Sequence, residues 1–275
     1  MQAEECISPQ VYEQIFEEPW VYYCERYTLL KTIGKSESIS PLSLRRKVIL
    51  DLNARTGYFM RMFLFEGVEK YIGIDRNSDY LEYGRSIVGG KFPTERYELY
   101  HIGTWDYLQI EQELESNLQN NSCDVVIGSL LLLGEKEVRD IVSIFKVAHK
   151  FLKSDGKLCL TLIPYQSTHD ESHSDTTIKK HSFKSQLISS SANSKLRSLT
   201  FYNKITSTES FSTSSVSFSS ELLSAELTSL GFSDISIKPL SEDPRTPKSY
   251  GPDYFQEFTT ESGLCSLLQA TKKEI

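Results

Sequence analysis

The fold of this chain is decided by residues 48–85, VILDLNARTGYFMRMFLFEGVEKYIGIDRNSDYLEYGR. Residues 47–52 are a short apolar run that includes an acid near its end, typical of a strand covered on both faces. A turn at Gly57 leads into an amphipathic helix, and residues 71–74 form a second apolar strand that ends at Asp75. This order predicts two parallel strands joined by a right-handed helical crossover.

The same alternation continues along the chain, with connections too long for hairpins. Further strands are predicted at 97–102, 124–127, 157–163, 232–239 and 264–271, and helices at 78–88, 135–152 and from 219 to 230. The sequence therefore predicts an α/β fold with a mostly parallel sheet and helices on both faces. In such sheets ligands bind at the carboxyl ends of the strands, where Asp51 and Asp75 stand.

Two segments fall outside this pattern. Residues 1–40 are predicted to form an N-terminal helical cap on a domain spanning 41–275, with its helical run at 8–34 interrupted by Pro19. Residues 166–215 are rich in Ser and Thr, with one strand-like stretch at 199–205. This insertion is either mobile or a loosely folded lid.

Composition and charge exclude several classes of function. The net charge of −7 argues against a nucleic-acid partner, and no apolar run is long enough to span a membrane. The acidic N-terminus lacks the features of a signal peptide, so a cytoplasmic location is expected. The five cysteines are scattered and predict no disulfide framework. His169 and His173 have helical spacing, with His181 nearby, but their Ser-rich surroundings do not favour a metal site, and none is predicted.

The motifs together resemble class I S-adenosylmethionine-dependent methyltransferases, and within them the small-molecule branch that includes toxoflavin synthase-like enzymes. The resemblance rests on the strand–acid–loop–glycine string at 48–57, the second strand ending at Asp75, and LKSDGKLCLTLI at 152–163. It covers most of the chain, including the helical segment at 11–34 and CDVVIGSLLLLGEKE at 123–137. It implies a Rossmann-like, seven-stranded sheet beneath an N-terminal helical cap.

The resemblance also implies an activity, namely methyl transfer from S-adenosylmethionine to a small-molecule acceptor. Such transfer depends on positioning, so no catalytic residue is assigned. Asp75 is expected to accept both ribose hydroxyls, Tyr80 to pack on adenine, and Tyr22, Tyr23 and Tyr27 to roof the substrate or simply to dock the cap on the sheet. The residues expected to bind the cofactor are Asp51, Asn53, Arg55, Gly57, Asp75, Arg76, Tyr80, Thr104, Trp105 and Ser129.

Several positions depart from the family pattern. Asn53 and Arg55 stand where the first loop usually has small residues, and Thr104-Trp105 replaces an acid, with Asp106 two residues further on. The fourth-strand loop has leucines, Leu130 and Leu133, where the family usually has polar or aromatic residues. A second reading therefore stays open, in which the chain is a catalytically inactive relative that serves as a binding or regulatory subunit with a protein partner. In a third reading, Arg55 attracts the phosphate of a different nucleotide to a helix N-terminus.

Overall fold

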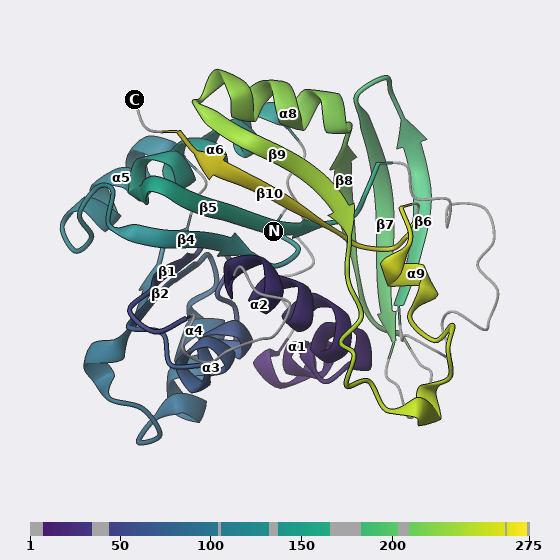
Figure 1. Ribbon diagram of the computed structural model, residues 1–275, viewed down its shortest axis with the longest axis horizontal. Coiled ribbons are helices and arrows are strands. Elements are labelled where there is room, and N and C mark those ends of the chain that lie inside the picture. The colour runs from purple at the N-terminus through teal and green to yellow at the C-terminus, as the bar shows by residue number, and fades with distance from the viewer. Residues whose placement is uncertain are drawn as a thin grey trace.

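The computed structural model describes residues 8–34, 44–103, 106–131, 137–165, 183–202, 209–261 and 263–273. Their strands form a central seven-stranded sheet, in the order β3-β2-β1-β4-β5-β10-β9, and a separate three-stranded sheet (Figure 1). The central strands are β1 (Val48–Asp51), β2 (Lys70–Asp75), β3 (Tyr97–His101), β4 (Cys123–Gly128), β5 (Leu152–Leu162), β9 (Phe232–Pro239) and β10 (Ser266–Lys272).

The central sheet is parallel except for one strand. β1 pairs in parallel with both β2 and β4, and β10 runs antiparallel to its neighbours β5 and β9. The chain passes outward from β1 to β3 and then returns to the opposite side of β1 with β4. This reversal beside β1 is the topological switch point at which open α/β sheets bind ligands. The expected Rossmann-like architecture is confirmed.

Helices cover both faces of the sheet, because the buried strands carry apolar side chains on each side. Ile49 and Tyr71 pack into a core with η2 and the helices α2, α3 and α4, whereas Leu50 and Ile72 pack into a second core with α5, α6 and α8. The bounds are α2 (Tyr27–Gly34), α3 (Tyr58–Phe65), α4 (Ser78–Val88), α5 (Tyr107–Glu115), α6 (Val138–Phe151), α8 (Ser220–Ser229), α9 (Gln256–Thr259), and the 3-10 turns η4 (Thr94–Arg96) and η5 (Lys248–Tyr250).

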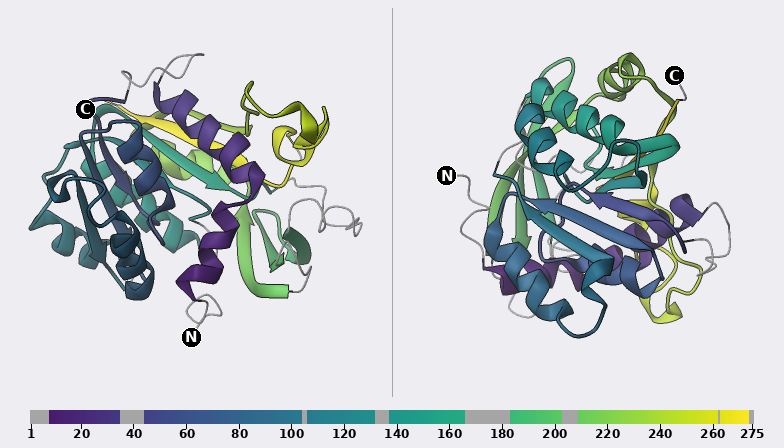
Figure 2. Two further views of the ribbon diagram at one scale, coloured as in Figure 1. Left: turned by 90° about the horizontal axis from the view of Figure 1, so that it is seen from below. Right: turned by 90° about the vertical axis from the view of Figure 1, so that its left-hand side faces the viewer.

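The N-terminal segment forms consecutive helices and crosses one side of the molecule (Figure 2). α1 (Pro9–Phe16) ends before Pro19, and a π-helix, η2 (Val21–Arg26), then runs directly into α2. Two contacts fix this segment to the chain after β9: Asp243 N–H donates to Tyr23 O at 2.8 Å, and Ser241 N–H donates to Thr28 Oγ1 at 2.7 Å.

Two sequence predictions need correction. Much of the insertion between 166 and 215 is ordered antiparallel sheet, formed by β6 (Phe183–Ser190), β7 (Ser194–Tyr202) and β8 (Glu209–Phe218). Inward side chains such as Leu199 and Phe201 supply its apolar face. Helix α5, which buries Ile110 and Leu114, lies between β3 and β4, where no helix was predicted.

Within the described ranges, no helix is both long enough and apolar enough to cross a bilayer.

Candidate functional site

The carboxyl ends of β1, β2 and β4 meet at one edge of the sheet because these neighbouring strands are parallel. β1 ends at Asp51, β2 ends at Asp75, and Ser129 directly follows β4. The structure thus brings together three of the residues predicted to bind a cofactor. We call this region the carboxyl edge.

Asp51 is completely buried and holds the first loop in place. Its Oδ1 accepts the N–H of Asn53 at 2.9 Å, and its Oδ2 accepts the hydroxyl of Tyr71. Burial, with a smaller contribution from the neighbouring acids Asp75 and Glu25, raises the pKa of Asp51 to about 7, although its two hydrogen bonds oppose the shift. The carboxyl of Asp51 therefore fixes the start of the first loop through its bond to Asn53.

Asp75 is also buried and accepts backbone hydrogen bonds on both of its oxygens. Arg55 N–H donates to Oδ2 at 2.7 Å, and Asn77 N–H donates to Oδ1 at 2.9 Å. Burial raises the pKa of Asp75, although these bonds and the charges of Arg55 and Arg76 oppose the shift. An ionised carboxylate has about four acceptor positions, so each oxygen can accept one further donor. Asp75 therefore keeps acceptor capacity beyond its two backbone hydrogen bonds.

The first loop is linked to the loop after β4 by the two residues that depart from the family pattern. Asn53 Nδ2 donates to Ser129 O at 2.9 Å, and Arg55 Nη2 lies 3.4 Å from Leu130 O. Arg55 also has a left-handed backbone, with φ of 49°, which costs a non-glycine residue about 1–2 kcal/mol. Both side chains are therefore integrated into the wall of the candidate site.

Two buried tyrosine rings and the guanidinium of Arg55 pack together beside this loop. The Arg55 guanidinium lies 4.8 Å from the centroid of the Tyr12 ring, and the Tyr12 and Tyr80 ring centroids are 4.8 Å apart. Tyr80, expected to pack on adenine, thus packs against Tyr12 of α1. The sequence offered no signal for Tyr12 beyond its place in an amphipathic helix.

Glu25 is a further buried acid at the carboxyl edge that the sequence analysis did not single out. Its Oε1 accepts the hydroxyls of Ser129 at 2.7 Å and Thr161 at 2.6 Å. Burial raises the pKa of Glu25 to about 7, even though these two hydrogen bonds oppose the shift. A glutamate inside an amphipathic helical run gives no sign of burial, because its partners lie 104 and 136 residues away.

The other predicted cofactor residues have varied surroundings. Gly57 begins α3 with φ of 76°, and a Cβ there would lie 2.8 Å from Met60 Cε. The carbonyl of Arg76 lies 3.0 Å from Nε2 of His101.

Thr104 and Trp105 lie outside the described residues, as does Leu133. Asp106, which was considered a substitute for the missing acid, caps α5 by accepting the N–H of Leu108 at 2.9 Å. Its carboxylate is therefore engaged at a helix start.

The three tyrosines expected near the substrate lie in different environments. Tyr23 packs against Tyr250 and Phe255, and Tyr27 is buried. Tyr22 is 46% exposed and lines an open cleft of about 370 Å³ between the N-terminal helices and α3.

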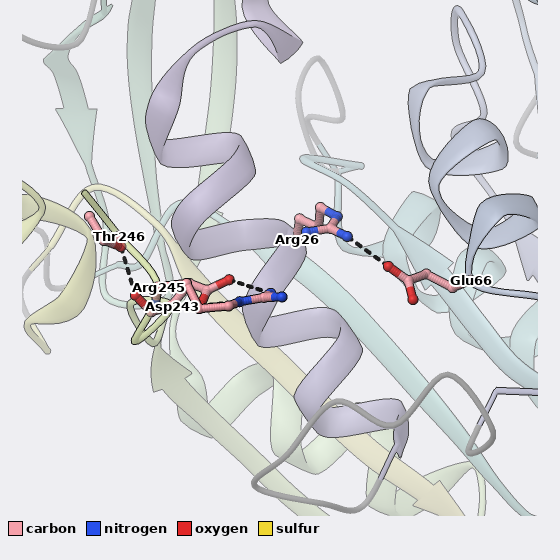
Figure 3. A network of polar contacts seen from close by, with 5 residues as sticks. All are labelled: Arg26, Glu66, Asp243, Arg245 and Thr246. Carbon is pink, nitrogen blue, oxygen red and sulfur yellow. Dashed lines mark hydrogen bonds and ion pairs between the residues drawn. The ribbon is translucent and has the colours of Figure 1, made fainter.

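An ion pair between Arg26 and Glu66, 2.7 Å long, joins the two walls of that cleft (Figure 3). Nearby, Asp243 pairs with Arg245 and also accepts the N–H of that residue. The Arg26–Glu66 pair fixes the cap against the end of α3, whereas the Asp243–Arg245 pair is local to the chain after β9.

Other candidates from the sequence have no metal-binding or disulfide role in the described part of the chain. His169, His173 and His181 lie outside it, and within it no group of three or more His, Cys, Asp or Glu side chains is arranged to hold a metal ion. The described cysteines, which exclude Cys6, are buried free thiols.

The acidic and hydrogen-bond-accepting groups at the carboxyl edge suit S-adenosylmethionine. This cofactor carries a ribose diol, a sulfonium, an ammonium and a carboxylate, and is therefore a net cation. Asp75 has acceptor capacity for the diol, and the buried carboxyls of Asp51 and Glu25 form no ion pair with any described Lys or Arg. Buried acids without counter-ions favour a positively charged ligand.

Comparisons with known proteins support the fold. No family model matches the chain, and no curated protein matches its sequence. Among solved structures it resembles an S-adenosylmethionine-dependent methyltransferase from Mesorhizobium loti, with 14% identity, a TM-score of 0.53, and coverage of 83% of this chain and 92% of that one. It also resembles a protein from Pyrococcus horikoshii, with 14% identity, a TM-score of 0.56, and coverage of 95% and 91%.

A third similar structure is the glycopeptide N-methyltransferase MtfA bound to S-adenosyl-L-methionine, with 14% identity, a TM-score of 0.53, and coverage of 89% and 93%. These likenesses establish that the chain has the fold of class I methyltransferases. At such identities they establish the fold alone.

Proposed function

We propose that this chain binds S-adenosylmethionine at its carboxyl edge and transfers the methyl group to a small molecule, as in the toxoflavin synthase-like branch it resembles. The observation that carries the proposal is Asp75, a buried acid at the end of the strand next to β1, with one acceptor position left on each oxygen. This is the position from which an acid binds a ribose diol in dinucleotide-binding sheets.

The residues of the site would act by positioning. The bound cofactor supplies an electrophilic methyl group, and the rate then depends on aligning an acceptor with it. Asp75 would fix the ribose, and Gly57 lets the backbone approach the ligand closely at the start of α3.

Calorimetric titration tests binding directly. We expect the native protein to bind S-adenosylmethionine and its demethylated product with micromolar affinity. We expect Asp75→Ala to abolish that binding, whereas Asp79→Ala, an exposed acid on the next turn, leaves it unchanged. Equal affinities in the native protein and Asp75→Ala would contradict the proposal.

The acceptor class is tested with cofactor that carries a radioactive methyl group. After incubation with a cell extract, we expect the label in the small-molecule fraction. Label only in protein or nucleic acid would contradict a small-molecule acceptor.

A second function is favoured by one specific observation, the links from Asn53 and Arg55 to the carbonyls of Ser129 and Leu130. They connect the two loops between which a ligand would pass, as expected of a methyltransferase-like binding or regulatory subunit without activity. The result that favours this reading is no binding by the native protein together with binding by Arg55→Gly. A phosphate ligand is less well supported, because the Arg55 guanidinium stacks on Tyr12 and faces the carbonyl of Leu130.

A further inference from the structure

Glu25 is a buried acid with one oxygen left without a partner. Its exposure is 0%, and hydroxyl groups of Ser129 and Thr161 donate to Oε1. Its Oε2 is buried and has no hydrogen-bond partner among the described residues. An unsatisfied buried carboxylate oxygen is costly, so its retention calls for a ligand or an explanation of its own.

No Lys or Arg side chain in the described part of the chain forms an ion pair with Glu25. The titratable groups facing it are Asp51 at the end of β1, Tyr58 at the start of α3, Cys265 before β10 and Cys24 on its own helix. Each of these is neutral or negative. Arg26, the adjacent cation, pairs with Glu66 of the α3 end instead.

The place of Glu25 along the carboxyl edge defines which part of a ligand it meets. Asp75 lies at the end of β2, whereas Glu25 is bonded to Ser129, directly after β4, and to Thr161 of β5, on the other side of β1. A nucleoside whose ribose is held by Asp75 can therefore extend its 5′ substituent across β1 toward Glu25. In S-adenosylmethionine that substituent begins with the sulfonium.

Glu25 is also placed by an unusual local structure. It lies in the π-helix η2, a rare conformation that is frequent at functional sites. The π-turn and the two hydroxyl donors together hold the carboxyl in one orientation, so that Oε2 is the oxygen left for a ligand.

We propose that Glu25 is the counter-ion of the cofactor's sulfonium, with Oε2 facing the positive sulfur, and that it makes the site prefer the cofactor over its demethylated product. This inference rests on the proposed function, because it presupposes that the carboxyl edge binds S-adenosylmethionine. The product carries a neutral thioether in place of the sulfonium and so loses the attraction. Glu25 acts as a specificity-determining residue that favours cofactor binding and product release.

Calorimetric titration of three proteins with S-adenosylmethionine and with S-adenosylhomocysteine tests the inference. Native protein is expected to bind the cofactor more tightly than the product. Glu25→Gln, which keeps the shape of the side chain and can keep its hydroxyl contacts, is expected to lose about tenfold in affinity for the cofactor and little for the product, because the lost charge acted in a buried site. Glu17→Gln, an exposed acid of the same N-terminal helical segment, is the matched control and should leave both affinities unchanged.

The outcomes separate this inference from the proposed function. If native protein binds neither ligand, the proposed function fails. If native protein binds both ligands, and Glu25→Gln lowers both affinities equally or leaves both unchanged, Glu25 is not the sulfonium counter-ion. The proposed function then still stands.

Two further measurements apply if Glu25→Gln does not fold. Glu25→Asp keeps the charge and should keep part of the preference for the cofactor. In the native protein, that preference should grow between about pH 6 and about pH 8 as Glu25 ionises. A preference that is absent in Glu25→Asp and constant with pH in the native protein would overturn the inference.

Discussion

The loops that follow β1 and β2 are neighbours at the carboxyl edge, but they differ in whether their polar groups remain available to a ligand. In the second loop, Asp75 is held by two backbone N–H groups and keeps acceptor capacity for a ligand. In the first loop, the side chains of Asn53 and Arg55 reach across to the loop after β4. The difference shows that Asp75, the residue expected to recognise a nucleoside, is retained. The first loop, in which small residues are usual, instead carries the larger side chains of Asn53 and Arg55.

The largest effect is expected from breaking the second loop. Asp75→Ala removes the acceptor of two buried N–H groups, each costing on the order of 1 kcal/mol, as well as the proposed ribose contact. We expect a free energy of unfolding lower by about 2 kcal/mol, measured by urea denaturation, and a loss of cofactor affinity of about a hundredfold or more. Unchanged stability in this variant would contradict a stabilising role for the two backbone hydrogen bonds that Asp75 accepts.

The buried acids Asp51 and Glu25 should make stability depend on pH. Burial raises the pKa values of Asp51 and Glu25 to about 7, well above the values of about 4 expected in the unfolded chain. The folded protein therefore binds more protons than the unfolded chain between these values. The contribution of these acids is fully present below about pH 4 and is lost as the pH rises through about 7.

Urea denaturation between about pH 5 and about pH 8 measures this effect. We expect the free energy of unfolding to fall with rising pH by an amount on the order of 2–3 kcal/mol for each of the two acids. Glu25→Gln, which does not titrate, should show a shallower fall. A native protein that becomes more stable over this range would contradict the burial of these uncompensated acids.

A smaller loss is expected when the support of Asp51 is weakened. Tyr71→Phe removes the hydroxyl that donates to Asp51 Oδ2 and leaves that oxygen without its donor. The free energy of unfolding should fall by about 1–2 kcal/mol. Tyr100→Phe, which removes a half-buried hydroxyl bonded to Glu98 on β3, is the matched control and should cost less. Equal losses of unfolding free energy in the two variants would contradict the larger contribution assigned to the bond between Tyr71 and Asp51.

The smallest net change in stability is expected at Arg55. Arg55→Gly relieves the left-handed strain, worth about 1–2 kcal/mol, but loses the stacking on Tyr12, worth about 0.5–2 kcal/mol. We therefore expect a change in unfolding free energy within about 1 kcal/mol, together with tighter cofactor binding because the first loop is opened. Weaker binding would instead show that Arg55 contacts the ligand, as the cofactor's carboxylate would require.

The sequence was informative where local pattern sets structure. The apolar runs of β1 and β2, ending in Asp51 and Asp75, predicted the parallel core and its binding edge, because buried parallel strands have a distinctive composition. Gly57 was predicted as the turn into α3, and the structure gives it a left-handed backbone.

The sequence was less informative where tertiary contacts decide. The three-stranded sheet β6–β8 was missed because serine and threonine occupy many of its positions, so its apolar alternation is weak. The burial of Glu25 depends on Ser129 and Thr161, which are distant in sequence, and a π-helix has no sequence pattern of its own. The packing of Tyr12 on Tyr80 likewise depends on how α1 docks.

A crystal structure of the protein with bound S-adenosylhomocysteine tests the central claim most directly. The account predicts ligand density at the carboxyl edge, with both ribose hydroxyls on Asp75 and the homocysteine portion directed across β1 toward Ser129 and Glu25. Ligand bound elsewhere, such as in the cleft lined by Tyr22, or a carboxyl edge that stays closed by Asn53 and Arg55 at saturating ligand, would contradict it.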